Sequence, residues 1–162
     1  MAFLIGGIMF NLFKKKNDHG IVSPCDGDYV AMHDIEDAVF SKAMMGPCFA
    51  VRPANENVYA PVEGTVAMIF PTKHAFGIKM NDVDVIVHIG IDTVNLQGEG
   101  FEVMVKEGQK VNKGDLLAKV DFDLVKKNGY KTDVIVALQN VELDYETGLN
   151  QVKAGDHIAN VK

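Results

Sequence analysis

Two histidines, His74 and His88, are the residues whose type and spacing could support chemistry. They lie in the segments Pro71–Gly77 and Val87–Val94, and an alternating stretch with Asn81-Asp82 at its middle separates them. Asn and Asp tolerate left-handed backbone angles, so this stretch predicts a tight turn between two antiparallel strands. The two imidazoles would then approach each other on one sheet.

The length of this turn decides how the two rings meet. A loop centred on Asn81 places His74 opposite His88 on one face, with Cβ atoms about 5 Å apart. A two-residue loop at Asn81-Asp82 shifts the register by one residue, which makes the pair diagonal or splits it across the faces. Spacing alone leaves open whether the pair is a chemical site or a coincidence.

Two chemistries suit such a pair. A neutral imidazole nitrogen is a competent nucleophile near neutral pH, because its unperturbed pKa is about 6.5. A zinc-dependent hydrolase would also use histidines, but zinc usually takes three or four protein ligands and no third-ligand motif accompanies His74 and His88. No metal is therefore required, although the two rings would supply half of an opportunistic zinc site that a partner's carboxylate completes.

The elements around the pair are predicted to be strands. From residue 20 onward, Val, Ile and Phe alternate with polar residues, and Gly, Pro, Asn and Asp interrupt at short intervals. Helical periodicity is nearly absent: residues 121–128, followed by Gly129, predict one short helix with a glycine C-cap, and residues 34–40 predict a further turn. The fold class is all-β with at most short helical turns.

Internal similarity indicates a duplicated β-motif. Residues 111–120 and 152–161 share the pattern V-x-x-G-D-x-[LI]-A-x-V, and Ser23–Gly27 resembles Ala60–Gly64. Such repeats in an all-β chain predict two similar motifs packed face to face, as an antiparallel β-sandwich or flattened barrel. The repeat does not continue, so no solenoid is predicted.

Composition narrows the class of protein. The 162 residues predict one domain with its own core, and hydrophobic content of 48% is ordinary for a globular protein. The net charge of −6 argues against nucleic-acid binding, because no basic face is available for phosphates. Cys25 and Cys48 are too few for a disulfide scaffold, so a reducing cytoplasm and buried thiols are favoured.

The first 19 residues are expected to be a flexible leader to the domain at 20–162. Residues 1–13 are apolar, but they are too short and too interrupted to span a bilayer, and Lys14–Lys16 follow them rather than precede them. Residues 1–16 would support at most a weak interfacial membrane association. A disordered leader, with a natural start at Met9, is the simpler interpretation.

Several motifs together resemble one known family, the glucose-type enzyme IIA of the bacterial phosphoenolpyruvate-dependent sugar phosphotransferase system. The histidine motifs carry the resemblance in their order and spacing. The matching segments are Pro71–Gly77, His88–Val94, Leu96–Phe101 and Glu107–Val111, with weaker matches at Val22–Gly27, Val39–Gly46 and Ala60–Gly64. They cover residues 20–162, and the family's antiparallel β-sandwich agrees with the fold class predicted above.

The resemblance implies a phosphotransferase component with a phosphohistidine intermediate and no cofactor. Such a carrier accepts a phosphoryl group from the histidine phosphocarrier protein (HPr) and passes it to a cysteine of enzyme IIB. Family members also regulate permeases or kinases by contacts that depend on phosphorylation, so a regulatory binding module is the alternative function. The sugar itself is bound by the membrane component.

By motif position, the resemblance assigns roles to four residues. His88 matches the phosphorylated nucleophile, and His74 matches the histidine that stabilises the phosphate. Thr72 matches the threonine that orients His74, and Asp92 matches an acidic residue beside the site. Gly90 removes side-chain bulk where a backbone group would contact the other nitrogen of the His88 ring or the phosphate.

The surroundings predict a docking surface for other proteins. Large apolar side chains are more numerous near the two motifs than a phosphate site alone requires, and an exposed group of them would form a shallow platform. Acidic residues at its rim, such as Asp37, would steer a basic donor. The predicted partner-binding residues are Val39, Phe40, Met45, Phe70, Phe76, Ile89 and Val94.

Overall fold

The structure is a computed structural model that describes residues 20–162. The predicted leader and its membrane contact at residues 1–16 lie outside the described residues. The strands are β1 (Gly20–Val22), β2 (Gly27–Ala31), β3 (Cys48–Pro53), β4 (Asn57–Tyr59), β5 (Gly64–Ile69), β6 (Ala75–Met80), β7 (Val83–Ile91), β8 (Phe101–Val103), β9 (Lys110–Val111), β10 (Leu116–Val120), β11 (Lys131–Leu138), β12 (Leu143–Tyr145), β13 (Gln151–Val152) and β14 (His157–Val161). The helical turns are η1 (Met32–Asp34), α2 (Ala38–Ser41), η2 (Thr93–Leu96) and α3 (Phe122–Lys127).

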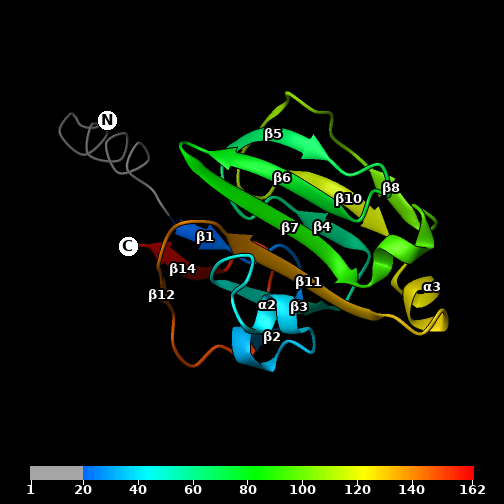
Figure 1. Cartoon of the computed structure of the whole chain (residues 1–162), viewed down its shortest axis with the longest axis horizontal. Coiled ribbons are helices and arrows are strands. Elements are labelled where there is room, and N and C mark those ends of the chain that lie inside the picture. Colours follow the sequence, from blue (N-terminus) through cyan, green and yellow to red (C-terminus); the bar gives the residue numbers. More distant parts are fainter. Residues whose placement is uncertain (1–19) are drawn as a thin grey trace.

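The strands form one large sheet that packs against two small ones (Figure 1). The eight-stranded sheet has the order β13-β2-β3-β11-β7-β6-β5-β9, and the three-stranded sheets are β1-β14-β12 and β4-β10-β8. Side chains from all three, such as Val87, Leu117 and Ile158, meet in the main core. The predicted antiparallel sandwich is confirmed.

The predicted duplication extends over the whole fold. Strands β4–β10 form an inner unit, and β1–β3 together with β11–β14 form an outer unit with the same pairings. The pairs β1–β14, β14–β12, β13–β2, β2–β3 and β3–β11 correspond to β4–β10, β10–β8, β9–β5, β5–β6 and β6–β7. The inner unit is inserted between the third and fourth strands of the outer unit, and β7–β11 joins the two.

The short motifs found in the sequence connect these units. Backbone N–H groups of Ser23 and Ala60 donate to the carbonyls of Asp156 and Asp115, each at 2.8 Å. The two motifs also bond each other reciprocally, because Val22 donates to the Pro61 carbonyl at 2.9 Å and Tyr59 donates to the Pro24 carbonyl at 2.7 Å. The duplicated loops therefore form the seam between the two units.

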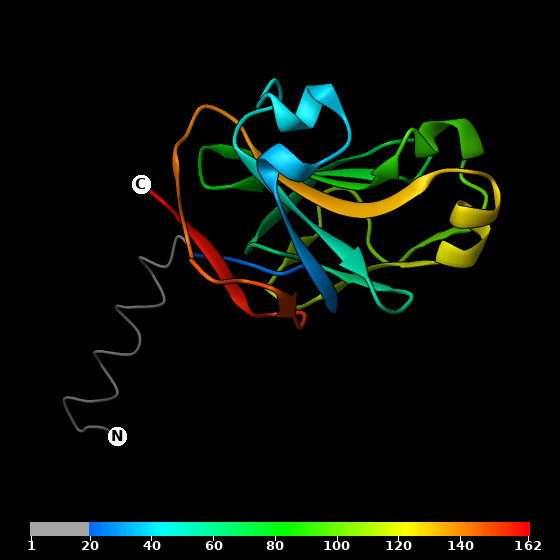
Figure 2. The ribbon, with the colours of Figure 1, turned by 90° about the horizontal axis from the view of Figure 1, so that it is seen from below.

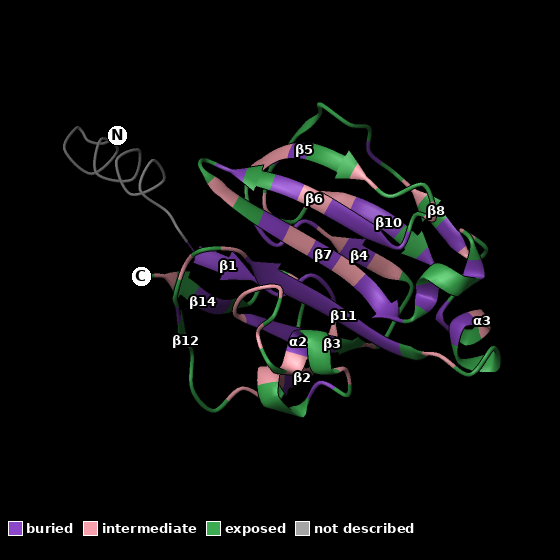
Figure 3. Cartoon of the chain, in the orientation of Figure 1, coloured by how far each residue is buried: buried purple, intermediate pink, exposed green. Residues whose placement is uncertain are grey.

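A second, smaller core lies on the opposite face of the large sheet. Side chains of β2, β3 and β11, including Ala50, Ile135 and Ala137, pack there beneath Phe40 of α2. Figure 2 shows the η1–α2 segment standing on this face, and Figure 3 shows the buried residues of β3 and β11 beneath it. This segment connects β2 to β3, where the inner unit has only the turn between β5 and β6.

The two predicted helical segments are present. Asp121 caps α3 by accepting a hydrogen bond from the Leu124 N–H at 3.1 Å, and Gly129 follows with φ +87°. The predicted turn at residues 34–40 overlaps η1 and α2.

Cys25 and Cys48 are free and buried, and burial raises the pKa of each thiol to about 12. Within residues 20–162, no helix is long and apolar enough to cross a membrane.

Candidate active site

His74 reaches the site from a tight turn that precedes β6. Lys73 donates its backbone N–H to the Phe70 carbonyl at 2.7 Å and has φ +64°, so the chain reverses immediately before His74. The His74 carbonyl then accepts the Ile89 N–H at 2.7 Å. These bonds attach the turn to β7 and place the His74 ring against the ring of His88.

The β6–β7 hairpin has the second of the two predicted registers. The loop is the two-residue turn Asn81-Asp82, and His88 lies opposite Ala75 rather than opposite His74. The rings still meet, with centroids 4.9 Å apart and planes at 86°. Strand alternation does not apply to His74, because it lies one residue before β6 on the turn that Lys73 bends.

His88 is fixed in one orientation by its Nδ1 atom. This nitrogen lies 2.7 Å from the Gly90 carbonyl oxygen, which only accepts hydrogen bonds, so Nδ1 carries the proton. The lone pair of the neutral ring is then on Nε2. The Phe40 ring packs against the imidazole, with centroids 5.1 Å apart. The expected contact between the Gly90 backbone and the His88 ring is thus present.

His74 is held by Thr72 and is almost fully buried. Its Nδ1 atom lies 2.8 Å from Thr72 Oγ1, and only 4% of the residue is exposed. Phe70 approaches the ring edge-on, with centroids 5.6 Å apart. A hydroxyl can either donate or accept. When Thr72 donates to Nδ1, the proton of His74 is on Nε2, where it can be donated to an anionic group.

Both histidines favour the neutral form at pH 7. Burial, and then the positive charge of His88, lower the pKa of His74 to about 4. Burial also lowers the pKa of His88, whereas the Gly90 hydrogen bond and the charges of Asp37 and Asp92 oppose that shift. The Nε2 lone pair of His88 is therefore available near neutral pH.

Gly90 occupies a position that no other residue could fill without strain. Its φ is +80°, and a Cβ atom there would lie 2.4 Å from Thr93 Cγ2 and 2.9 Å from the Lys131 carbonyl oxygen. Thr93 itself is fully buried and donates its hydroxyl to the Ile89 carbonyl at 2.5 Å. The sequence analysis did not assign a role to Thr93. The available signal was that Thr93 directly follows Asp92 in the second histidine motif.

Two acidic residues flank His88. Asp92 has φ +62° at the start of η2 and is exposed, so its carboxylate acts on the His88 ring through charge rather than as a helix cap. Asp37 caps α2 by accepting a hydrogen bond from the Val39 N–H at 2.8 Å. The sequence analysis placed Asp37 only at the rim of the docking surface. Asp37 and His88 are far apart in the chain, so the sequence does not show that the charge of Asp37 acts on His88.

The predicted docking residues divide into exposed and buried groups. Val39, Phe70 and Val94 are 41%, 38% and 47% exposed, and Met45 is partly buried. Phe40 of α2 is buried, so it is wrong as an exposed docking residue; its ring packs against His88 instead. Met44 on the same segment is 69% exposed.

Phe76 and Ile89 are wrong as docking residues. Both are fully buried in the main core. The reason is strand alternation: His88 faces outward, so its neighbour Ile89 faces inward, and Phe76 pairs with the inward-facing Val87.

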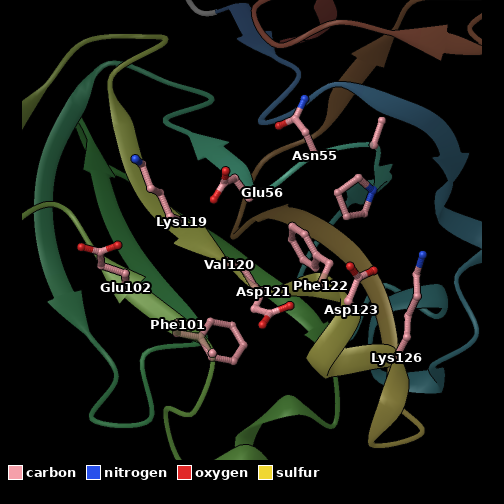
Figure 4. Close-up of a pocket in the computed structure, with 13 residues that line it drawn as sticks. Asn55, Glu56, Phe101, Glu102, Lys119, Val120, Asp121, Phe122, Asp123 and Lys126 are labelled. Carbon is pink, nitrogen blue, oxygen red and sulfur yellow. The ribbon is translucent and has the colours of Figure 1, made fainter.

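Two hollows in the described part of the chain lie away from the histidine pair. The hollow in Figure 4, of about 640 Å³, lies between the β3–β4 loop and α3, and a neighbouring one of about 780 Å³ borders Arg52 and Lys153. Neither is lined by His74 or His88. Residues 20–162 also contain no group of three or more His, Cys, Asp or Glu that could hold a metal ion. His88 is only partly buried, which suits a reaction with a group that another protein presents.

Comparison with known proteins agrees with this geometry. The model of the family "phosphoenolpyruvate-dependent sugar phosphotransferase system, EIIA 1" matches residues 19–143. The chain belongs to this family. It is therefore a phosphotransferase component that carries a phosphoryl group in sugar uptake, as the motifs predicted.

Several named relatives cover most of this chain. The glucose-specific EIIA component of Mycoplasma capricolum is 39% identical over 145 residues, 88% of this chain and 94% of its own length. That of Halalkalibacterium halodurans is 42% identical over 142 residues, 83% of this chain and 82% of its own. The solved structure of glucose permease IIA from Mycoplasma capricolum superposes with a TM-score of 0.77 at 38% identity, and the match covers 86% of this chain and 93% of that one.

One relative is much longer. The glucose-specific EIICBA component of Streptococcus pneumoniae is 50% identical over 121 residues. The match covers 74% of this chain but only 17% of that protein.

Proposed function

We propose that Nε2 of His88 accepts a phosphoryl group from HPr and passes it to a cysteine of enzyme IIB. The observation that carries this proposal is the bond from His88 Nδ1–H to the Gly90 carbonyl, which leaves Nε2 as the nucleophile. In the first transfer, the Nε2 lone pair forms a bond to phosphorus while the bond to the donor nitrogen breaks. Nδ1 keeps its proton, so no base is needed to activate the ring.

His74 then stabilises the phosphoryl group. Its ring lies beside that of His88, and with Thr72 donating to Nδ1 its Nε2–H can donate to a phosphoryl oxygen. Phosphoryl transfer through a loose transition state depends mainly on positioning and charge stabilisation. Because both histidines favour the neutral form, the charge of the phosphoryl group is stabilised by hydrogen-bond donors rather than by a cationic ring.

Partners are proposed to dock on the exposed residues Val39, Phe70, Val94 and Met44 around His88. Methionine repacks easily, which suits one surface to an unlike donor and acceptor. A regulated permease or kinase bound on the same surface would sense whether His88 is phosphorylated, which supports regulation as a second role.

The relatives' names lead us to propose glucose as the transported sugar and the cytoplasm as the location.

Incubation with phosphoenolpyruvate, enzyme I and HPr tests the phosphoryl site. We expect one acid-labile, base-stable phosphate per chain, bonded to Nε2 by NMR and absent from His88→Ala. His74→Ala should still take the label but transfer it more slowly to enzyme IIB. A wild-type chain without label would refute the proposal.

The same assay tests the docking surface. Phe70→Ser should raise the HPr concentration needed for half-maximal labelling about tenfold, because it removes an exposed apolar contact beside the site. Val141→Ser changes a partly buried apolar residue beyond the other end of β11 and serves as the control. Equal effects of the two substitutions would contradict this surface.

A further inference from the structure

Thr93 is a buried polar residue to which the proposed mechanism assigns no role. It opens η2 and has no exposed surface. Its hydroxyl donates to the Ile89 carbonyl at 2.5 Å, and its methyl group lies where a side chain on residue 90 would otherwise extend. Both groups of Thr93 therefore act on the backbone immediately after His88.

The backbone at this point is not held by a regular strand ladder. The pairing of β7 with β11 shifts register between Lys131 and Val134, which lie opposite Ile91 and Ile89. Gly90 lies within this irregularity at φ +80°. A different constraint must fix its peptide groups, and Thr93 supplies it.

A short chain of contacts leads from Thr93 to the nucleophile. The Ile89 carbonyl and the Gly90 N–H belong to one planar peptide group. By donating to this carbonyl, the Thr93 hydroxyl fixes the orientation of the peptide group that precedes Gly90. The methyl group of Thr93 and the Lys131 carbonyl then restrict the space beside Gly90 Cα. The Gly90 carbonyl is thereby held 2.7 Å from His88 Nδ1.

We propose that Thr93 is a positioning residue for phosphoryl transfer: it holds the Gly90 carbonyl against His88 Nδ1–H and so keeps the Nε2 lone pair free. This inference rests on the proposed function of His88. Without the hydroxyl, the Ile89–Gly90 peptide can rotate, and His88 loses the acceptor that selects its tautomer. A neutral ring with its proton on Nε2 has no lone pair there to attack phosphorus.

Three substitutions separate the two groups of Thr93. Thr93→Val keeps the shape and removes the hydroxyl, Thr93→Ala removes both groups, and Thr93→Ser keeps only the hydroxyl. The control is Ser23→Ala, which removes another buried hydroxyl that donates to a backbone carbonyl, that of Cys25 at 2.7 Å, in the loop after β1. Urea denaturation identifies which variants fold cooperatively.

The primary readout is the tautomer of His88, measured from ring ¹⁵N chemical shifts without any phosphoryl donor. We expect the Nδ1–H tautomer in wild type, Thr93→Ser and Ser23→Ala, and a mixture of tautomers in Thr93→Val and Thr93→Ala. Labelling by HPr should slow in the last two in proportion to the Nδ1–H fraction that is lost, up to about tenfold, because loss of one buried hydrogen bond shifts an equilibrium by about that factor. A merely structural role would lower stability and leave the tautomer unchanged.

An unchanged His88 tautomer in a folded Thr93→Val protein would overturn the inference. If Thr93→Val does not fold, the smaller Thr93→Ala decides in the same way, and a tautomer shift in Ser23→Ala would also count against Thr93. Failure of the proposed function gives a different result: the wild-type chain takes no label, while the tautomer measurement still decides whether Thr93 positions His88.

Discussion

His74 and His88 lie side by side but receive different hydrogen-bond partners. The carbonyl of Gly90 only accepts, so it fixes His88 in one tautomer, whereas the hydroxyl of Thr72 can donate or accept at His74 Nδ1. His74 is therefore able to change tautomer according to the group that its Nε2 atom meets. A phosphoryl oxygen, which only accepts, selects the tautomer with the proton on Nε2.

The shifted pKa of His74 predicts a loss of stability in mild acid. Burial and the charge of His88 lower this pKa to about 4, compared with about 6.5 in an unfolded chain. Between these values the unfolded state binds more protons, so the free energy of unfolding falls as the pH falls through this window. We expect a loss of about 2 kcal/mol between pH 8 and pH 5, measured by urea denaturation.

A glutamine at position 74 should remove much of this pH dependence, since it does not titrate. His33→Gln is the matched control, because His33 is exposed and outside the site. An equally steep pH dependence in His74→Gln would mean that other groups cause it.

Two glycines have similar backbone angles, but replacing each with alanine should lower the free energy of unfolding by different amounts. Gly108 has φ +89° and nothing within 4 Å of a Cβ atom, so Gly108→Ala meets only the left-handed backbone cost of about 1 kcal/mol. Gly90→Ala adds the collision with Thr93, and we expect a loss of about 3 kcal/mol in urea denaturation. Equal losses would show that the space around Gly90 relaxes freely.

Sequence reasoning predicted which residues lie together around the histidine pair, but not how they are held. The histidine motifs and the family resemblance located His74, His88 and Thr72. The role of Thr93 could not be predicted, because it depends on the irregular pairing opposite Gly90. The errors at Phe76 and Ile89 were avoidable: an outward-facing His88 already requires Ile89 to face inward.

Among the elements, α2 shows how a short helix depends on its contacts. Four residues are too few for an independently stable helix. The Asp37 cap and the burial of Phe40 over the smaller core hold it in place. The sequence predicted only a turn here, since one helical turn has no periodicity to detect. The hairpin register likewise depended on a one-residue difference in loop length, which residue types alone do not determine.

Asp37 should have two separable effects, one on α2 and one on His88. Asp37→Ala removes the cap and should lower the free energy of unfolding by about 1 kcal/mol, whereas Asp37→Asn keeps a capping oxygen and should change it little. Both substitutions remove a charge that raises the pKa of His88, so this pKa, followed by NMR titration, should fall in both variants. A large loss of stability in Asp37→Asn would contradict the capping role.

At the scale of the molecule, one seven-stranded unit is inserted into another. The sequence repeats revealed the duplication at its best-preserved loops. They did not reveal that one unit is inserted into the other. The outer unit is interrupted by the whole of the inner unit, so its strands appear as two unrelated stretches of sequence. The site itself draws on both units: His74 and His88 come from the inner one, and Phe40 comes from the outer one.

A circular permutant tests this nesting. Gly20 pairs with Asn160, so a linker of about five residues can join Lys162 to Gly20. New ends between the exposed Asn55 and Glu56 would place the two units in tandem. We expect cooperative unfolding with a loss of about 1–2 kcal/mol, from hydrogen bonds made by the opened loop, and normal labelling of His88. A permutant that does not fold would show that chain order, and not pairing alone, determines the fold.

The nested arrangement also sets an order of events on the ribosome. The inner unit, with both histidines, emerges as one continuous segment, while β1 must wait for β14, its partner from almost the other end of the domain. At ordinary translation speeds that wait is about ten seconds. For about three of these seconds, between the synthesis of β7 and that of β11, the edge of β7 that pairs with β11 is open, and an open strand edge can pair with other chains.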